Sequence, residues 1–281
     1  MYKDTKWAKE IVSLQDDEGK WGYFHTLFAD SKSSYTTEKA LKRLEMFGYT
    51  IEDKCIQKAV SYMNDCLTGV KEIPDKREKL HDWNIFTSLI LATWIRRFTK
   101  DNPAANAVAE KWAKIVTIAF KDGAYNQQEY IQAYHDILGM KPQGGRLIDF
   151  VQFYSVSIIN GCLDQETERK VLEYIINKPN GIYYTYEKCI STLPNVFESK
   201  TASWYLGAIE LISEYETAKD QLQFVVDWIK ENMNEVGKWD MGKGAKDGVY
   251  FPLSNDWRKK ETREYDCTNR IMKLLDKLGE H

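Results

Sequence analysis

The chain has 281 residues, of which 43% are hydrophobic and 29% are charged, and its formal net charge is −3. That length is ample for a packed core without a disulfide or metal staple, and only 6 Pro and 16 Gly argue against disorder and many-turned β architectures. The weakly acidic balance gives no support to nucleic-acid binding.

The N-terminal residues are charged and no apolar run follows them, so we expect no signal peptide. The longest apolar stretch, around 85–94, stops at Arg96 and Arg97 and is too short to span a bilayer. Five cysteines without a CxxC pair favour reduced thiols. We therefore expect a cytoplasmic protein without integral membrane association.

A glycine recurs about every 55 residues, and in four of five cases an aromatic residue stands two positions after it. The five are Gly19, Gly69, Gly123, Gly181 and Gly237. Segments with apolar residues at helical spacing precede the last four, within 56–63, 108–119, 171–176 and 225–229. A glycine just after the last helical turn suits a left-handed C-cap.

A different kind of helix is predicted after each glycine loop. Segments 81–98, 147–159 and 202–212 are apolar on nearly every side, which is typical of helices enclosed by other elements, and 36–44 and 268–278 complete the set. An exposed helix, a glycine loop and an enclosed helix thus alternate five times. This pattern predicts an all-α fold, an α/α toroid of about five outer/inner helix hairpins, as a single domain over 1–281.

One glycine loop carries a specific motif. Residues 15–21 read Gln-Asp-Asp-Glu-Gly-Lys-Trp, which resembles the QW motif, Q-x(3)-G-x-W, of the terpenoid cyclases and the related protein prenyltransferase β subunits. Gly237-Lys238-Trp239 is a degenerate second copy, with Asn232 near the place of the Gln. The resemblance implies the toroid of that superfamily, in which the Gln satisfies a helix end and the Trp packs into the seam between repeats.

The catalytic signatures of these families are absent from the sequence. There is no Asp-x-Asp-Asp run, and Asp65-Cys66 and Asp266-Cys267 are adjacent, whereas the zinc-binding pair of the prenyltransferases is spaced by one residue. We therefore assign no metal ligand, and the question of zinc near Asp266 and Cys267 and of any cofactor stays open.

The candidate catalytic residues lie near the starts of the enclosed helices, which all begin on one face of a closed ring. Asp82, beside His81, is the first acid/base candidate, although it also fits a helix cap. Asp149 and Asp266 are predicted one turn inside enclosed helices, where Arg146 and Arg270 could pair with them. The expected catalytic set is Asp82, His81, Asp149 and Asp266.

The candidate substrate-binding residues are aromatic or basic and lie near the same helix ends. Aromatic walls suit carbocations and equally suit sugar rings, and basic side chains with helix N-termini suit anions. The set is Trp83, Arg146, Tyr184, Trp204, Trp239, Tyr250, Trp257 and Arg263.

These features favour an enzyme that acts on an isoprenoid or other apolar substrate by acid/base chemistry, as a prenyltransferase- or cyclase-like transferase, isomerase or lyase. A carbohydrate-active α/α-barrel hydrolase or lyase is an alternative, and it requires two carboxyls about 5–9.5 Å apart across a cleft. A non-catalytic, ligand-binding toroid is the third reading, and it accommodates the absent signatures.

Overall fold

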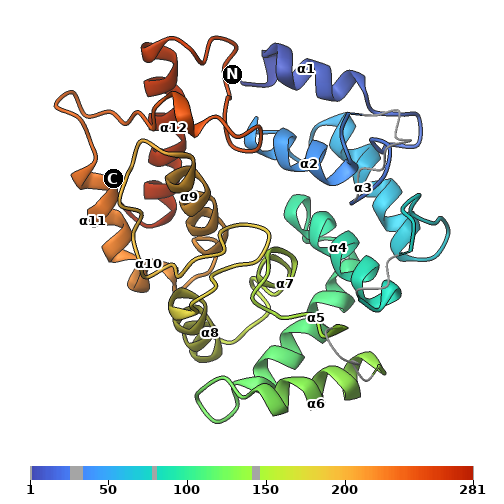
Figure 1. Cartoon of the computed structure of the whole chain (residues 1–281). Helices are drawn as coiled ribbons and strands as arrows, with labels where there is room; N and C mark the ends of the chain where they lie inside the picture. The colour runs from blue at the N-terminus through green and yellow to red at the C-terminus, as the bar shows by residue number, and fades with distance from the viewer. Residues whose placement is uncertain (1, 26–33, 78–80, 141–145, 281) are drawn as a thin grey trace. The chain divides into compact units, whose positions relative to one another are not determined.

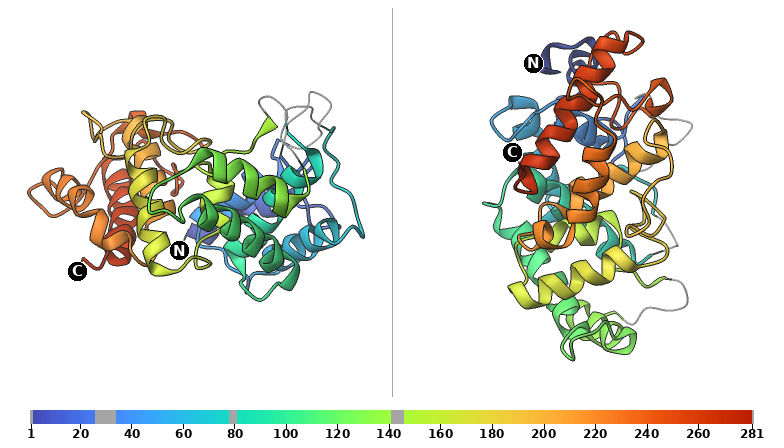
Figure 2. Two further views of the ribbon diagram at one scale, coloured as in Figure 1. Left: turned by 90° about the horizontal axis from the view of Figure 1, so that it is seen from below. Right: turned by 90° about the vertical axis from the view of Figure 1, so that its left-hand side faces the viewer.

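The computed structural model describes residues 2–25, 34–77, 81–140 and 146–280. Twelve α-helices run through these ranges, and their only β pairing consists of isolated bridges, Gln152 to Tyr183 and Ile182 to Tyr186 (Figures 1 and 2). The predicted all-α class is confirmed.

The chain divides into two compact units. Unit 1 comprises Met1–Lys114 and Ile131–Ile148, and unit 2 comprises Ile115–Tyr130 and Asp149–His281. Two helices, α5 (Pro103–Ala119) and α6 (Gln127–Leu138), begin in one unit and end in the other. The single domain and the closed toroid both stay predictions.

Four helices belong to unit 1 alone: α1 (Lys6–Ser13), α2 (Thr37–Met46), α3 (Lys54–Leu67) and α4 (Trp83–Phe98). α1 packs on α2, and α3 packs on α4. The second half of α4 is buried on nearly every side, as the apolar sequence of an enclosed helix predicts. The side chains of Thr36 and Asp82 cap α2 and α4 by accepting backbone N–H groups of their first turns.

The helices of unit 2 are α7 (Phe153–Ile158), α8 (Gln165–Asn177), α9 (Lys200–Ile212), α10 (Ala218–Gln221), α11 (Gln223–Glu231) and α12 (Lys260–Lys277). α7 packs on α9, and α10 packs on both α8 and α11. α12 begins at Lys260, eight residues before the predicted 268.

The predicted helix over 147–159 is wrong in its first half. Val151 and Phe153 instead form extended backbone bonds with Tyr183: the Tyr183 N–H donates to the Val151 carbonyl at 3.3 Å, and the Phe153 N–H donates to the Tyr183 carbonyl at 3.0 Å. The strand-like pairing takes backbone groups that a helix would use, so α7 is only six residues long.

All five repeat glycines have positive φ, from 54° at Gly181 to 98° at Gly19. The steric requirement is strongest at Gly181, where a Cβ would lie 2.2 Å from the carbonyl oxygen of Lys188, and at Gly19, where it would lie 2.5 Å from that of Lys58. The predicted left-handed helix cap is confirmed at Gly69, which directly follows the C-cap residue of α3. It is wrong at the other four glycines, which lie four to six residues beyond the last residue of their helices, in separate turns that require a positive φ.

The first Gly-Lys-Trp turn is fixed by its tryptophan and by its glutamine. Trp21 is fully buried, its indole Nε1 donates to the Ile11 carbonyl at 2.6 Å, and its backbone N–H donates to Thr37 Oγ1 at 3.0 Å. The Gln15 amide donates to the carbonyls of Gly19 at 2.9 Å and Cys55 at 2.8 Å. The glutamine thus joins the turn to the start of α3.

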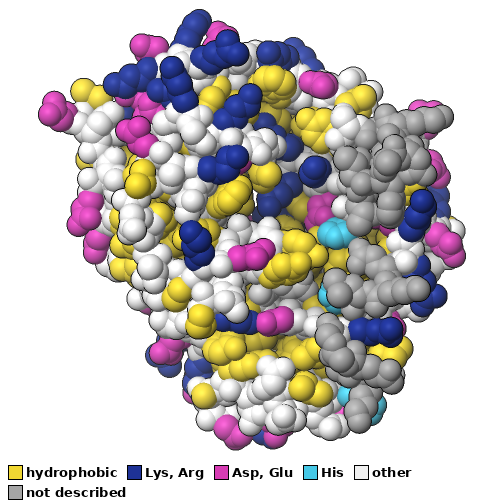
Figure 3. Space-filling view, in the orientation of Figure 1, with side chains coloured by type: hydrophobic (Ala, Val, Ile, Leu, Met, Phe, Trp, Pro, Cys, Tyr) yellow, Lys and Arg dark blue, Asp and Glu magenta, His cyan; other side chains and the backbone are white. Residues whose placement is uncertain are grey.

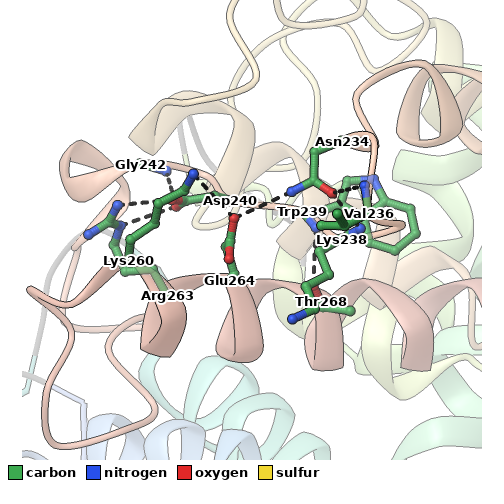
Figure 4. Close-up of polar contacts among 10 residues, drawn as sticks. All are labelled: Asn234, Val236, Lys238, Trp239, Asp240, Gly242, Lys260, Arg263, Glu264 and Thr268. Carbon is green, nitrogen blue, oxygen red and sulfur yellow. Dashed lines mark hydrogen bonds and ion pairs between the residues drawn. The ribbon is translucent and has the colours of Figure 1, made fainter.

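The second turn repeats this pattern (Figure 4). Trp239 Nε1 donates to the Ile229 carbonyl at 2.7 Å, and the Trp239 N–H donates to Thr268 Oγ1 at 3.1 Å. The Asn234 side chain accepts the Lys238 N–H at 2.9 Å, as Asp16 accepts the Lys20 N–H at 3.1 Å in the first turn. Asn232, the C-cap of α11, donates its side-chain amide to the Trp228 carbonyl in the last turn of that helix at 2.8 Å, so it satisfies a helix end.

Candidate acid–base site

An imidazole and a carboxylate meet at the first turn of α2 in unit 1. His25 Nδ1 lies 2.7 Å from Glu38 Oε2, and both side chains are 15% exposed. The second carboxylate oxygen, Glu38 Oε1, accepts the indole N–H of the buried Trp94 at 2.9 Å. Glu38 is thus held from both sides, by α4 and by the loop that carries His25.

Backbone hydrogen bonds place His25 opposite Glu38. The buried Asp75 carboxylate accepts the N–H groups of Phe24 at 2.5 Å and His25 at 2.8 Å. In turn, the Glu38 N–H donates to the Phe24 carbonyl at 3.1 Å. The loop and the helix start are therefore fixed to each other independently of the His25–Glu38 contact.

The buried ring of Phe86, in the first turn of α4, contacts two imidazoles. His25 meets it edge-on with ring centroids 5.3 Å apart, and His81 stacks on it at 5.1 Å. Histidine side chains reach the surface at several points of the face drawn in Figure 3, close to hydrophobic and acidic ones. Two titratable rings therefore share one apolar neighbour.

Asp82 is the N-cap of α4, because its Oδ1 accepts the Ile85 N–H at 3.0 Å. It also acts electrostatically, since burial together with the Asp82 charge raises the pKa of Tyr134. Trp83 is half-buried beside it, whereas Arg146 is exposed. The structure thus brings His81 and Asp82 next to the His25–Glu38 pair through Phe86.

The chemistry of this pair follows from its geometry. An ionised carboxylate can only accept, so an ionised Glu38 predicts that His25 Nδ1 carries the proton and that Nε2 of a neutral ring carries the lone pair. A carboxylate behind an imidazole fixes its tautomer and orientation and stabilises the imidazolium formed when Nε2 takes a proton. A histidine that takes up a proton through Nε2 requires this orientation.

Asp149 and Asp266, two of the predicted catalytic residues, have structural roles in unit 2. Asp149 is exposed, lies outside any helix and is paired with Lys178, so the predicted intrahelical pairing with Arg146 is wrong. Asp266 is fully buried in α12, where it accepts the N–H groups of Leu253 at 3.2 Å and Ser254 at 2.8 Å. Arg270, the partner predicted for Asp266, instead makes a two-pronged ion pair with Glu210 at 2.6 and 2.9 Å.

Cys267 and Asp266 are both engaged inside unit 2. Burial raises the pKa of the Cys267 thiol to about 12, and its Sγ accepts the Met241 N–H at 3.4 Å. The Asp266 oxygens are bound by Leu253 and Ser254. No group of three or more potential metal ligands occurs in the part of the chain that the structure describes.

Arg263 and Asp240 face each other in Figure 4. Arg263 Nε and Nη2 donate to the two Asp240 oxygens at 3.2 and 2.9 Å, and Asp240 also accepts the Gly242 N–H at 2.8 Å. Only 7% of Arg263 is exposed. Arg263, which was predicted to bind an anionic substrate, thus stabilises the loop after Trp239.

The remaining aromatic candidates fall into two groups. Trp239, Tyr250 and Trp257 are buried, with the Arg270 guanidinium 4.3 Å from the Tyr250 ring centroid. Tyr184 and Trp204 are 40% and 41% exposed. The first group stabilises the fold of unit 2, and the second remains available to a ligand.

A groove of about 490 Å³ lies on unit 2 between the residues that follow Tyr186 and the start of α9. Thr192, Asn195, Ser199 and Thr201 supply hydroxyl and amide groups to its lining, together with Lys188. The sequence analysis did not predict this groove, because its lining residues carry no periodic or motif signal.

Comparisons with known proteins place the chain in no characterised group. No family model, curated protein or solved structure matches it. Within the described ranges, no helix is both long enough and apolar enough to cross a membrane.

Sequence reasoning missed the partnership of His25, Glu38 and Trp94. Glu38 belongs to a predicted helix start, but His25 lies in an irregular loop and Trp94 lies deep in an enclosed helix. The one available signal was the scarcity of histidine, with 4 in the chain. Only tertiary packing brings the three together.

Proposed function

We propose that this protein is an acid–base enzyme of the terpenoid cyclase and prenyltransferase-like toroid class, acting on an isoprenoid or comparably apolar substrate. His25 is the general base, and Glu38 fixes its tautomer. The observation that carries the proposal is the 2.7 Å contact between His25 Nδ1 and Glu38 Oε2, in a setting where each side chain is only 15% exposed.

The class assignment is supported by the paired Gly-Lys-Trp turns. Trp21 and Trp239 both donate an indole N–H to a carbonyl ten residues earlier and a backbone N–H to a threonine hydroxyl. A loop geometry that recurs in two distant parts of the chain favours a repeat architecture of the kind the QW-like motif implies.

An apolar substrate is favoured by the surroundings of the pair. Phe86 and Trp94 are buried aromatic rings in direct contact with His25 or Glu38. Rings of this kind attract a developing positive charge through their faces, and a partly dry setting strengthens the proton transfer. In this proposal Asp82 is a positioning residue that caps α4 and so holds Phe86.

Carbohydrate hydrolysis receives less support from the carboxylates that it would require. Asp149 is paired with Lys178, and Asp266 is fully buried with its oxygens bound to backbone N–H groups and to Ser254. Neither carboxyl is available as the second member of a catalytic pair.

The test is conversion of a defined isoprenoid panel by the purified protein. Squalene, farnesyl diphosphate and geranylgeranyl diphosphate are incubated separately, and products are identified by gas chromatography with mass spectrometry. We expect one of them to be converted, and His25→Gln and Glu38→Gln each to lower kcat by about a hundredfold or more. His135→Gln is the matched control, because this exposed histidine lies beside Asp136 on α6. Absence of conversion of all three, or equal loss in the control, would contradict the proposal.

A further inference from the structure

The turn at Ile182–Tyr186 in unit 2 holds a side chain in a backbone conformation that side chains rarely adopt. Tyr184 has a φ of 67°, which makes it the one non-glycine residue with positive φ among the described residues. The Thr185 N–H donates to the Ile182 carbonyl at 3.1 Å, so Tyr184 takes the third position of a β-turn, where glycine or asparagine is usual. An aromatic side chain at that position costs free energy.

The turn cannot relax by itself, because its backbone is fixed on both sides. Ile182 and Tyr186 exchange N–H···O bonds of 2.8 and 2.9 Å. Tyr183 is bonded to Val151 and Phe153 at the start of α7. The strain is therefore built in by the surrounding structure.

The strained residue is exposed and does not serve the core. Tyr183 and Tyr184 are 47% and 40% exposed, and their ring centroids are 4.0 Å apart at an angle of 42°. On its inner side, Tyr184 meets Tyr154 edge-on at 5.7 Å. Two adjoining aromatic rings are thus presented to solvent from a rigid support.

Polar groups that follow the turn decide which ligand suits it. The groove that begins at Tyr186 is lined by the hydroxyls of Thr192 and Thr201 and by the Asn195 amide. A hydrocarbon placed there would leave these groups desolvated and unpaired, which is unfavourable.

We propose that the Ile182–Tyr186 turn and the adjoining groove form a binding site for a neutral saccharide. The C–H face of a pyranose ring packs on Tyr183 and Tyr184, and its hydroxyls pair with the groove lining. The site lies in unit 2, and the proposal does not rest on the acid–base function proposed for unit 1.

The test separates strain from binding by substituting Tyr184. Tyr184→Gly and Tyr184→Asn both suit a φ of 67°, so we expect the melting temperature of each variant to be equal to or above that of the wild type. Binding is measured by saturation-transfer NMR and calorimetry with maltotetraose, cellotetraose and chitotetraose. At least one should bind the wild type, and both substitutions should weaken it about tenfold or more.

Two further variants complete the experiment. Thr192→Val keeps the shape and removes a hydroxyl of the groove lining, and it should also weaken binding. Tyr265→Ala removes another exposed tyrosine of unit 2, 64% exposed on α12, and should leave binding unchanged. The proposal is overturned if none of the three saccharides binds at about 10 mM, if binding survives in Tyr184→Gly, or if both Tyr184 variants melt well below the wild type.

Discussion

Asp82 illustrates how one carboxylate can cap a helix and still affect a site. Its Oδ1 accepts the Ile85 N–H at 3.0 Å, and its charge contributes to the raised pKa of Tyr134. Asparagine caps about as well as aspartate. We therefore expect Asp82→Asn to change the free energy of unfolding by less than about 0.5 kcal/mol and to leave turnover within about threefold of the wild type.

Urea unfolding and steady-state kinetics of Asp82→Asn measure both quantities. A loss of turnover by orders of magnitude in a stable variant would instead make Asp82 the proton donor, as the sequence first suggested. Asp82→Ala measures the contribution of the cap, because alanine cannot cap α4 and should lower the free energy of unfolding by about 1 kcal/mol.

Cys267 gives a pH dependence of stability with a definite sign. Burial raises the pKa of its thiol from 9.0 to about 12, so the folded state retains a proton that the unfolded state releases. The stabilisation is fully present below about pH 9 and is lost as the pH rises from there towards 12. We expect stability to fall less steeply between about pH 8 and pH 10.5 in Cys267→Ala than in the wild type. Urea midpoints across that range test this, and parallel curves would show that the thiol does not contribute.

At the scale of elements, the period of the apolar residues predicted most helices, because each buries a face of definite width. Segments 81–98 and 202–212 correspond closely to α4 and α9. The exception at 147–159 has a physical cause: the residues before Phe153 pair with the backbone of Tyr183, more than twenty residues away. Local periodicity carries no information about such a partner.

Because the two Gly-Lys-Trp turns make the same contacts, we expect the loss of either tryptophan to destabilise the protein by the same amount. Trp21 and Trp239 are 0% and 3% exposed and make the same two hydrogen bonds. Replacement of either by alanine should lower the free energy of unfolding by roughly 3–5 kcal/mol. Trp204→Ala is the matched control, since Trp204 is 41% exposed and should cost about 1 kcal/mol or less. A near-neutral Trp21→Ala in denaturant unfolding would argue against the repeat.

At the scale of the whole molecule, the two units share helices α5 and α6. Unfolding of either unit would break both of these helices and so destabilise the other unit. We therefore expect one cooperative unfolding transition. Calorimetry should give a van't Hoff enthalpy equal to the calorimetric enthalpy. Two resolved transitions would mean that the units are separate domains and that the single-domain prediction is wrong.

The candidate site was less predictable than the fold. His81 and Asp82 were found because a helix start is visible in sequence, whereas His25 reaches Glu38 only through the loop that Asp75 fixes. Asp149 and Asp266 were chosen as acids for their place in the chain, and their partners Lys178 and Ser254 come from other segments. Burial and pairing are properties of the folded molecule, and they decide which carboxylate can react.

The tautomer of His25 tests the central claim most directly. Nitrogen-15 NMR of the labelled protein, with His25→Gln to assign the signals, reports which ring nitrogen carries the proton in the neutral imidazole. We predict protonated Nδ1 and unprotonated Nε2, because Glu38 Oε2 lies 2.7 Å from Nδ1 and can only accept when ionised. In Glu38→Gln this preference should be lost. A neutral His25 protonated at Nε2 in the wild type would put the lone pair on Nδ1, against the Glu38 carboxylate, and leave none on Nε2 to act as the base, which would contradict the account.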